Sequence, residues 1–246
     1  MPRRERLPRL LRKIANWYLD KRSKGILHIG AHEAAEARFY NDKSVIWIEA
    51  NPELMPGLLR NIAPFPKQRA FCALLGDAER DVDFKIASNF GASSSVFELG
   101  PYSSGPQSLW PGYELQMQKS IHLSMQMLDH FVAERAIDVR RYDHWVLDVQ
   151  GAELLVLKGA VNSLALCKVI STEISTVEVY KDGALYPEIR KFLAGAGFTP
   201  LVEPHSLSMQ HGDITFVHIS LKQSLYFRFL LFLLAFASAD ELPAAY

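Results

Sequence analysis

The sequence has little cysteine, no net charge and no long apolar run. Only Cys72 and Cys167 occur, both in apolar stretches and without metal-ligand spacing, which fits buried reduced thiols and a cytoplasmic protein. Lys plus Arg and Asp plus Glu both number 27, so overall charge gives no reason to expect a nucleic-acid partner. The most apolar stretch, residues 225–237, contains Arg228 and is shorter than the roughly 18–20 residues of a membrane span. No apolar region follows the basic N-terminus as in a secretory signal.

The composition divides the chain into three segments. Residues 1–24 hold nine Lys and Arg against two acidic residues, with leucines and aromatic residues at helical spacing, which predicts a basic amphipathic helix. We expect its apolar stripe to pack on the main domain, and peripheral binding to a membrane surface is the alternative. Residues 25–220 form the main domain. Residues 221–246 are an apolar tail that we expect to be buried on this domain, in a homo-oligomer or on a membrane, without a choice among the three.

Strand-like and helix-like patterns alternate within residues 25–220. This alternation predicts an α/β fold of Rossmann-like type, with a mostly parallel sheet, helices on both faces and a C-terminal antiparallel hairpin. A stretch rich in Gly and Pro at 100–112 predicts a loop, either a lid over a site or a surface excursion. The expected strands are 25–29, 44–48, 68–75, 144–148 and 168–172, the expected helices 34–40, 52–59, 151–158 and 186–194, and the hairpin strands 198–202 and 214–219.

Ligands of open α/β sheets bind outside the carboxyl ends of the strands, so the residues that follow each expected strand matter most. Several of them are carboxylates, which together indicate a ligand-binding rim although each alone could be a helix cap. The set comprises Gly30, Ala31, His32, Glu49, Asp77, Asp148 and Glu173.

The turn after the first strand gives a clue to the ligand. Gly30 permits a tight turn, and Glu49, nineteen residues later, can accept hydrogen bonds from both hydroxyls of a ribose. The turn lacks the second and third glycines of a dinucleotide site, and it places Glu33 and Glu36 in the expected first helical turn. Two carboxylates repel a pyrophosphate and suit a ligand that carries a positive centre and no phosphate, although they could also serve only the helix dipole. An NAD-dependent oxidoreductase is therefore disfavoured.

The segment from Asp148 to Glu153 is the strongest single motif. Asp148 ends an apolar strand, Gly151 permits a turn, and Glu153 opens the next expected helix, so we expect both carboxylates at one rim of the sheet. A plain strand–turn–helix junction would explain the two carboxylates but does not require Gln150 between them. Asp148 and Glu153 are the first candidates for a general base, ahead of His32 and His122.

An ordered set of short blocks resembles the FkbM family of methyltransferases. The resemblance runs from about residue 25 to 218 and implies a class I methyltransferase fold, S-adenosyl-L-methionine as cofactor and O-methylation of a saccharide or natural product. The blocks are LHIGAH at 27–32, IEANP at 48–52, GASSSV at 91–96, LDVQGAELLVLKGA at 147–160, TEIS at 172–175 and FLAGAGF at 192–198.

The resemblance also implies roles for single residues. Gly30, Ala31 and His32 would line the methionine part of the cofactor, and Asp148 would face the reacting centre. The cofactor set is completed by Glu49 on the ribose, its neighbour Asn51, and Asp77 near the adenine. No metal ligand is expected. Two residues depart from the family pattern, His28 in place of an acidic residue and Ala34 in place of a glycine, so a catalytically inactive nucleoside-binding module is the alternative.

Overall fold

The computed structural model describes residues 6–204 and 209–223, so most of the predicted apolar tail lies outside the described residues. The α-helices are α1 (Arg6–Arg22), α2 (Met55–Ile62), α3 (Leu128–Glu134), α4 (Glu153–Lys158), α5 (Val161–Leu164) and α6 (Tyr186–Gly195). The 3-10 turns are η2 (Ala37–Tyr40), η3 (Pro52–Leu54), η4 (Val139–Arg141) and η6 (Ile219–Gln223). The strands are β1 (Gly25–Ile29), β2 (Ser44–Glu49), β3 (Gln68–Cys72), β4 (Leu74–Gly76), β5 (Arg80–Ala87), β6 (Met117–Met127), β7 (His144–Leu147), β8 (Val169–Ser175), β9 (Phe198–Pro200) and β10 (His211–His218).

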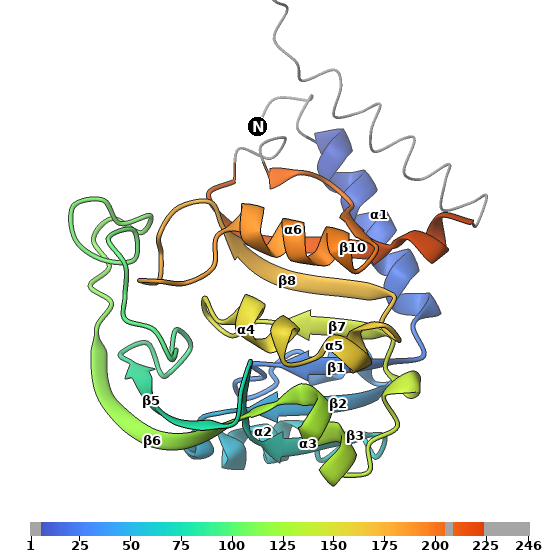
Figure 1. Cartoon of the computed structure of the whole chain (residues 1–246), viewed down its shortest axis with the longest axis horizontal. Coiled ribbons are helices and arrows are strands. Elements are labelled where there is room, and N and C mark those ends of the chain that lie inside the picture. The colour runs from blue at the N-terminus through green and yellow to red at the C-terminus, as the bar shows by residue number, and fades with distance from the viewer. Residues whose placement is uncertain (1–5, 205–208, 224–246) are drawn as a thin grey trace, which may run out of the picture.

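Seven strands form the main sheet in the order β3-β2-β1-β7-β8-β10-β9 (Figure 1). The first five are parallel, and β10 runs antiparallel to both β8 and β9. The predicted Rossmann-like sheet with its C-terminal antiparallel hairpin is therefore confirmed. The strand order reverses between β1 and β7, which is where open α/β sheets bind their ligands.

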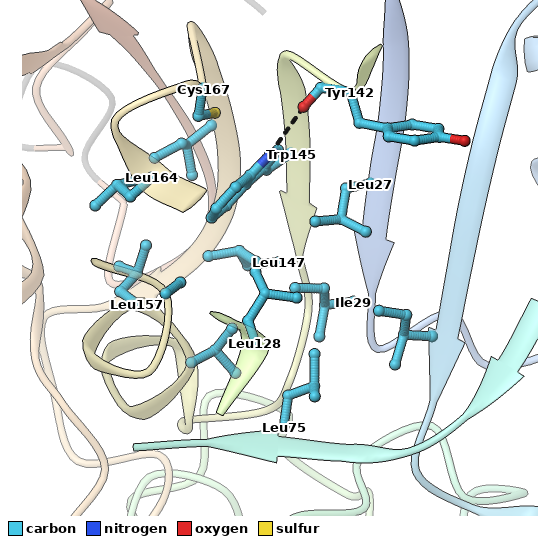
Figure 2. Packing of buried hydrophobic residues seen from close by; sticks show 14 of the residues in the cluster. Leu27, Ile29, Leu75, Leu128, Tyr142, Trp145, Leu147, Leu157, Leu164 and Cys167 are labelled. Carbon is cyan, nitrogen blue, oxygen red and sulfur yellow. Dashed lines mark hydrogen bonds between the residues drawn. The ribbon is translucent and has the colours of Figure 1, made fainter. Parts of the chain in front are cut away.

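The central strands are buried on both faces, as expected for parallel strands covered by helices. On β1, Leu27 and Ile29 point to the face covered by α3 to α6, where Figure 2 shows them packed with Trp145 and Leu147. Ile26 points to the other face, which η2 and α2 cover. The same alternation in β2 makes the sheet the middle layer of a three-layer domain, with helices on both faces as predicted.

The N-terminal helix α1 packs across the amino ends of the parallel strands. Ala15 and Leu19 are buried against Val169 and Val217 of β8 and β10. Asp20 Oδ1 lies 3.2 Å from Nδ1 of His144 at the start of β7, and just after the helix the backbone N–H of Lys24 donates to Asp143 Oδ1 at 2.8 Å. No helix within the described ranges is long and apolar enough to span a bilayer.

Two predictions of local structure are wrong. The helix expected over 34–40 is reduced to η2, because His32 and Ala34 adopt φ values of 48° and 51°, in the left-handed region that an α-helix excludes. Glu33 and Glu36 therefore do not lie in a first helical turn. The single strand expected over 68–75 is broken at Ala73, where the chain leaves the main sheet and enters a second sheet.

That second sheet has the order β4-β6-β5 and was not predicted. Its strand β4 runs parallel to β6, and β5 runs antiparallel to β6. The long segment 88–116 connects β5 to β6 without forming a helix, in keeping with the loop expected at 100–112. The second sheet matters for function because β4 and β5 supply one wall of the cavity described next.

Candidate functional site

A cavity opens at the carboxyl ends of β1, β2 and β7, at the point where the strand order reverses. Four of the predicted site residues line it: Gly30, His32, Glu49 and Asp148. The other lining residues are Ile29, Ile48, Ala50, Ala73, Leu74, Leu75, Phe84, Gly91, Ala92, Ser94, Val96, Val149, Gln150 and Ala152.

Glu49 is held by backbone donors on both of its oxygens. Oε2 accepts the N–H of His32 at 2.7 Å, and Oε1 accepts the N–H of Asn51 at 2.7 Å. Burial raises the pKa of Glu49, and these hydrogen bonds oppose the rise. Because an ionised carboxylate offers about four acceptor positions, roughly two remain for hydroxyl donors of a ligand.

A second loop, residues 88–94, closes one side of the cavity. Its Phe90 carbonyl lies 3.0 Å from Nε2 of His32, and Ser94 Oγ accepts the backbone N–H of Ala87 at 3.1 Å. Gly91 follows with φ +81°, a conformation that glycine adopts without strain. The Phe90 side chain itself is 91% exposed beside the cavity. The turn after β1 and the loop 88–94, which are far apart in the sequence, are thus joined at the cavity.

Asp148 lies at the opposite side of the cavity from Glu49, after the end of β7. Asp148 is open to solvent on the cavity side, but the protein atoms packed around its carboxyl group, together with the neighbouring Glu173, raise its pKa to about 7. The side-chain amide of Gln150 donates to Asp148 Oδ1 and opposes this rise. A carboxyl with this pKa can exist as the base near neutral pH, which is the requirement for taking a proton.

Glu153 does not share this position. Its side chain is buried behind the β7–α4 turn, where Oε1 accepts the backbone N–H groups of Val149 at 3.1 Å and Gly151 at 3.3 Å. Burial raises the pKa of Glu153 to about 8, with Glu173 and Asp148 adding to the effect. Glu153 does not line the cavity, so the structure separates the two carboxylates that the sequence placed at one rim.

The remaining predicted cofactor residues lie at or beyond the border of the cavity. Ala31 is buried in the packing between β1 and α2. Asn51 is buried next to Glu49, and its Oδ1 accepts the N–H of Glu53 at the start of η3. Asp77 follows β4, pairs with Arg80 at 2.7 Å and does not line the cavity.

Several residues of the site were not singled out from the sequence. Phe84 enters the cavity from β5, and the apolar alternation of Val82, Phe84 and Ile86 was the signal for that strand. His211 and Tyr180 surround the acidic side, and nothing in their local sequence marks them. The pairing of β10 with β8 places His211 there, and the connection between β8 and α6 places Tyr180 there.

The residues that line the cavity form an apolar wall and an acidic side. Ala50, Leu74 and Phe84 belong to the wall, and Glu49 and Asp148 are the acidic groups. None of the described residues that line the cavity is Lys or Arg. A phosphate would find no cationic partner there, whereas a flat apolar ring, ribose hydroxyls and a positive centre each meet a suitable surface.

Comparison with known proteins gives consistent findings. A model of the FkbM methyltransferase domain matches residues 28–200. The 2-O-methyltransferase NoeI of Sinorhizobium fredii is 26% identical over 168 residues, which cover 66% of this chain and 68% of that protein.

Similarities to solved structures are more distant. Fibrillarin of Aeropyrum pernix, crystallised with natively bound S-adenosyl-L-methionine, has a TM-score of 0.41 and 14% identity over 78% of this chain and 66% of its own, just under two thirds. Magnesium protoporphyrin IX methyltransferase of Synechocystis PCC 6803 has a TM-score of 0.39 and 9% identity over 86% of this chain and 79% of its own.

Proposed function

This chain belongs to the FkbM family of methyltransferases, and from that premise we propose that it transfers a methyl group from S-adenosyl-L-methionine to a hydroxyl oxygen of a saccharide or natural product. The observation that carries the proposal is the cavity at the strand-order reversal, which has Glu49 at one side and Asp148 at the other. Transfer to an oxygen is supported by the 2-O-methyltransferase relative, and the saccharide or natural-product acceptor follows from the family resemblance.

Glu49 is the residue that would hold the ribose of the cofactor. Its two oxygens are already oriented by the N–H groups of His32 and Asn51, so no side-chain rearrangement is needed to receive two hydroxyls. The adenine would lie against the apolar wall beside Ala50 and Leu74. The methionine part would follow the turn at Gly30 toward Asp148. We assign no cofactor contact to Asp77, because Arg80 holds its carboxylate outside the cavity.

The bound cofactor supplies an electrophilic methyl carbon on a positively charged sulfur. The protein has to exclude water, align the acceptor oxygen with that carbon and accept the hydroxyl proton. Asp148 is the base in this proposal: its carboxylate would take the proton of the acceptor hydroxyl as that oxygen receives the methyl group that the cofactor would supply. Asp148 sits at the cavity wall, whereas the buried Glu153 supports the turn that carries it.

The acceptor would approach from the side of β8 and β10. There the ring of Trp110, from the Gly- and Pro-rich loop, meets the ring of His211 edge to face at a centroid distance of 5.2 Å. His211 Nε2 in turn contacts Glu173 Oε1 at 3.0 Å. The loop is tied down by a hydrogen bond of 2.7 Å from Gly100 N–H to the Val179 carbonyl. A half-exposed Trp beside carboxylates and a histidine provides the stacking surface and hydrogen-bond partners that a hydroxylated ring requires.

A methyl-transfer assay with isotopically labelled S-adenosyl-L-methionine tests the proposal. The acceptor panel should hold saccharides, glycolipids and polyketide alcohols, and the products should be examined for O-methyl groups by NMR. We expect turnover with at least one hydroxylated acceptor. Binding of the cofactor without turnover on any acceptor would favour the inactive nucleoside-binding module, and failure to bind the cofactor would contradict both readings.

A further inference from the structure

Gln150 occupies a strained position in the β7–α4 turn. Its φ is +56°, a left-handed conformation that costs free energy for any residue other than glycine, and Gly151 follows at +93°. Glycine at both positions 150 and 151 could adopt these conformations without strain. The side chain of Gln150 lines the cavity, so the strained backbone holds a polar group at the proposed reaction site.

The amide of Gln150 joins the two carboxylates at the carboxyl ends of β7 and β8. Its Nε2 donates to Asp148 Oδ1 and, at 3.0 Å, to Glu173 Oε2. An amide nitrogen has two hydrogens, so both are used. Among the described residues, hydrogen bonds to the side chain of Asp148 reach only Oδ1, so Oδ2 is available to accept a hydrogen bond from a ligand.

The orientation of the amide is fixed from the other side. The hydroxyl of Tyr180 donates to Gln150 Oε1, and the two carboxylates on the other side can only accept, so the amide nitrogen faces the carboxylates and its oxygen faces Tyr180. Ser95 Oγ donates to the backbone carbonyl of Gln150 at 2.7 Å and holds the main chain. Every polar group of the Gln150 side chain thus has a partner that sets its direction.

Like charges gather around Asp148 from each neighbouring element. Glu173 on β8, Asp213 on β10 and Glu36 in the turn after β1 all disfavour its ionised form. The buried Glu153 lies behind it on α4, and His211 on β10 contacts Glu173 rather than Asp148. The side chain that favours ionised Asp148 by hydrogen bonding is that of Gln150.

We infer that Gln150 is a positioning residue, which orients Asp148 Oδ2 toward the acceptor hydroxyl and keeps Asp148 ionised beside Glu173. The inference rests on the proposed function, since it assigns the role of Gln150 to the proton transfer of that reaction. The proton leaves the acceptor oxygen for Asp148 Oδ2, while Oδ1 remains bonded to the amide. Tyr180 acts one step further away by holding the amide in place.

Two substitutions with opposite expected effects test the inference. Gln150→Met keeps the length of the side chain but removes both donors, so the pKa of Asp148 should rise by about one unit. Glu173→Gln removes the neighbouring charge, so the pKa of Asp148 should fall by a similar amount. Gln116→Met, at an exposed position before β6, is the matched control and should leave the pKa unchanged.

The pKa can be read without turnover, from the ¹³C chemical shift of the Asp148 carboxyl in protein labelled at aspartate and free of cofactor. Asp148→Asn identifies the signal. In the active enzyme the acid limb of kcat should move in the same directions, to higher pH for Gln150→Met and to lower pH for Glu173→Gln. Cofactor affinity should stay within about twofold of the wild type in both variants.

A purely structural role for Gln150 would lower the melting temperature and leave the carboxyl titration in place, which would overturn the inference. Shifts of the same sign in both variants would do so as well. If Gln150→Met does not fold, Tyr180→Phe decides, because it removes only the hydroxyl that orients the amide; we expect a smaller upward shift, and no shift would contradict us. A wild type that titrates as expected but methylates no acceptor would refute the proposed function alone.

Discussion

The carboxylate of Glu49 accepts the backbone N–H of His32 at 2.7 Å, which ties the end of β2 to the turn that follows β1. The same carboxylate holds the N–H of Asn51. Glu49 therefore shapes the cofactor side of the cavity in addition to offering acceptors to a ligand. Its replacement should affect binding and local stability together.

We expect Glu49→Gln to weaken S-adenosyl-L-methionine binding about tenfold or more, because hydrogen bonds to a charged group contribute roughly 1.5–3 kcal/mol. The melting temperature should also fall, because glutamine has one side-chain oxygen and cannot replace both oxygens of Glu49, which accept from His32 and Asn51. Titration calorimetry measures the affinity. Asp77→Asn is the control, and it should leave the affinity unchanged because Asp77 pairs with Arg80 away from the cavity. Equal changes in affinity for Glu49→Gln and Asp77→Asn would show that Glu49 does not bind the cofactor.

Cofactor choice follows from the charges of the cavity and from its first turn. A pyrophosphate needs cationic or helix-terminal partners, and the turn after β1 leads to η2 instead of an α-helix. S-adenosyl-L-methionine should therefore raise the melting temperature and NAD should not. At one hundred times its dissociation constant a ligand stabilises the fold by roughly 2.7 kcal/mol, which a thermal melt detects. A shift with NAD alone would contradict the assignment.

Asp148→Asn should lower kcat by about two to four orders of magnitude, the usual contribution of a general base. The volume is kept while the charge and basicity are lost, so cofactor affinity should change little. Rate and melting temperature are to be measured on one preparation. A lower melting temperature with an unchanged rate per folded molecule would show that Asp148 serves only the turn.

Glu153 should make stability depend on pH. Its pKa is raised from 4.5 to about 8 in the folded protein, so between these values the folded state holds a proton that the unfolded state has released. The free energy of unfolding should therefore fall as pH rises through this window. Glu153→Gln keeps an acceptor for Val149 and Gly151 and should make the fall shallower, with the contribution of Asp148 remaining. Urea unfolding at several pH values checks this; an unchanged slope would show that Glu153 is ionised in the fold.

The sequence predicted the parts of this fold that rest on local pattern. The buried strands β1, β2 and β7 are mostly apolar, and a residue that lines the cavity follows β1 and β7 and ends β2. The turn after β1 was misjudged because the left-handed conformations of His32 and Ala34 have no signature in side-chain hydrophobicity. The second sheet was missed because β6 is half exposed along most of its length, which weakens its alternation.

The roles within the motif from Asp148 to Glu153 could not be separated by spacing alone. Both carboxylates flank the same turn, and only the backbone path shows that Glu153 points inward to Val149 and Gly151. The partners of Gln150 come from residues 23 and 30 positions away, Glu173 and Tyr180, so no local pattern could identify them.

The helix α1 should bind an anionic lipid surface. Trp17 and Ile14 are exposed, 60% and 36%, on the side opposite the buried Ala15 and Leu19, and the first 24 residues carry nine basic against two acidic side chains. An amphipathic basic helix with an exposed Trp binds such surfaces through both properties. Sedimentation with vesicles should show binding to anionic but not to neutral lipid.

Trp17→Ala should weaken vesicle binding several-fold. Phe39→Ala is its control, because Phe39 is as exposed but lies on η2 and is not part of the basic helix. Binding should also weaken as salt is raised, since it depends on exposed charges. Equal loss in the two variants, or dimer formation through Trp17 in sedimentation analysis, would contradict a lipid-binding role.

The placement of α1 at the amino ends of the strands makes this electrically neutral protein a dipole. The helix α1 holds six Lys and Arg residues against the single acidic residue Asp20, so the remainder of the chain carries an equal excess of negative charge. The carboxylates Glu49, Asp148 and Glu173 stand at the opposite ends of the same strands. An anionic surface would therefore orient the molecule before any contact forms, with the cavity turned to the water and open to its substrates.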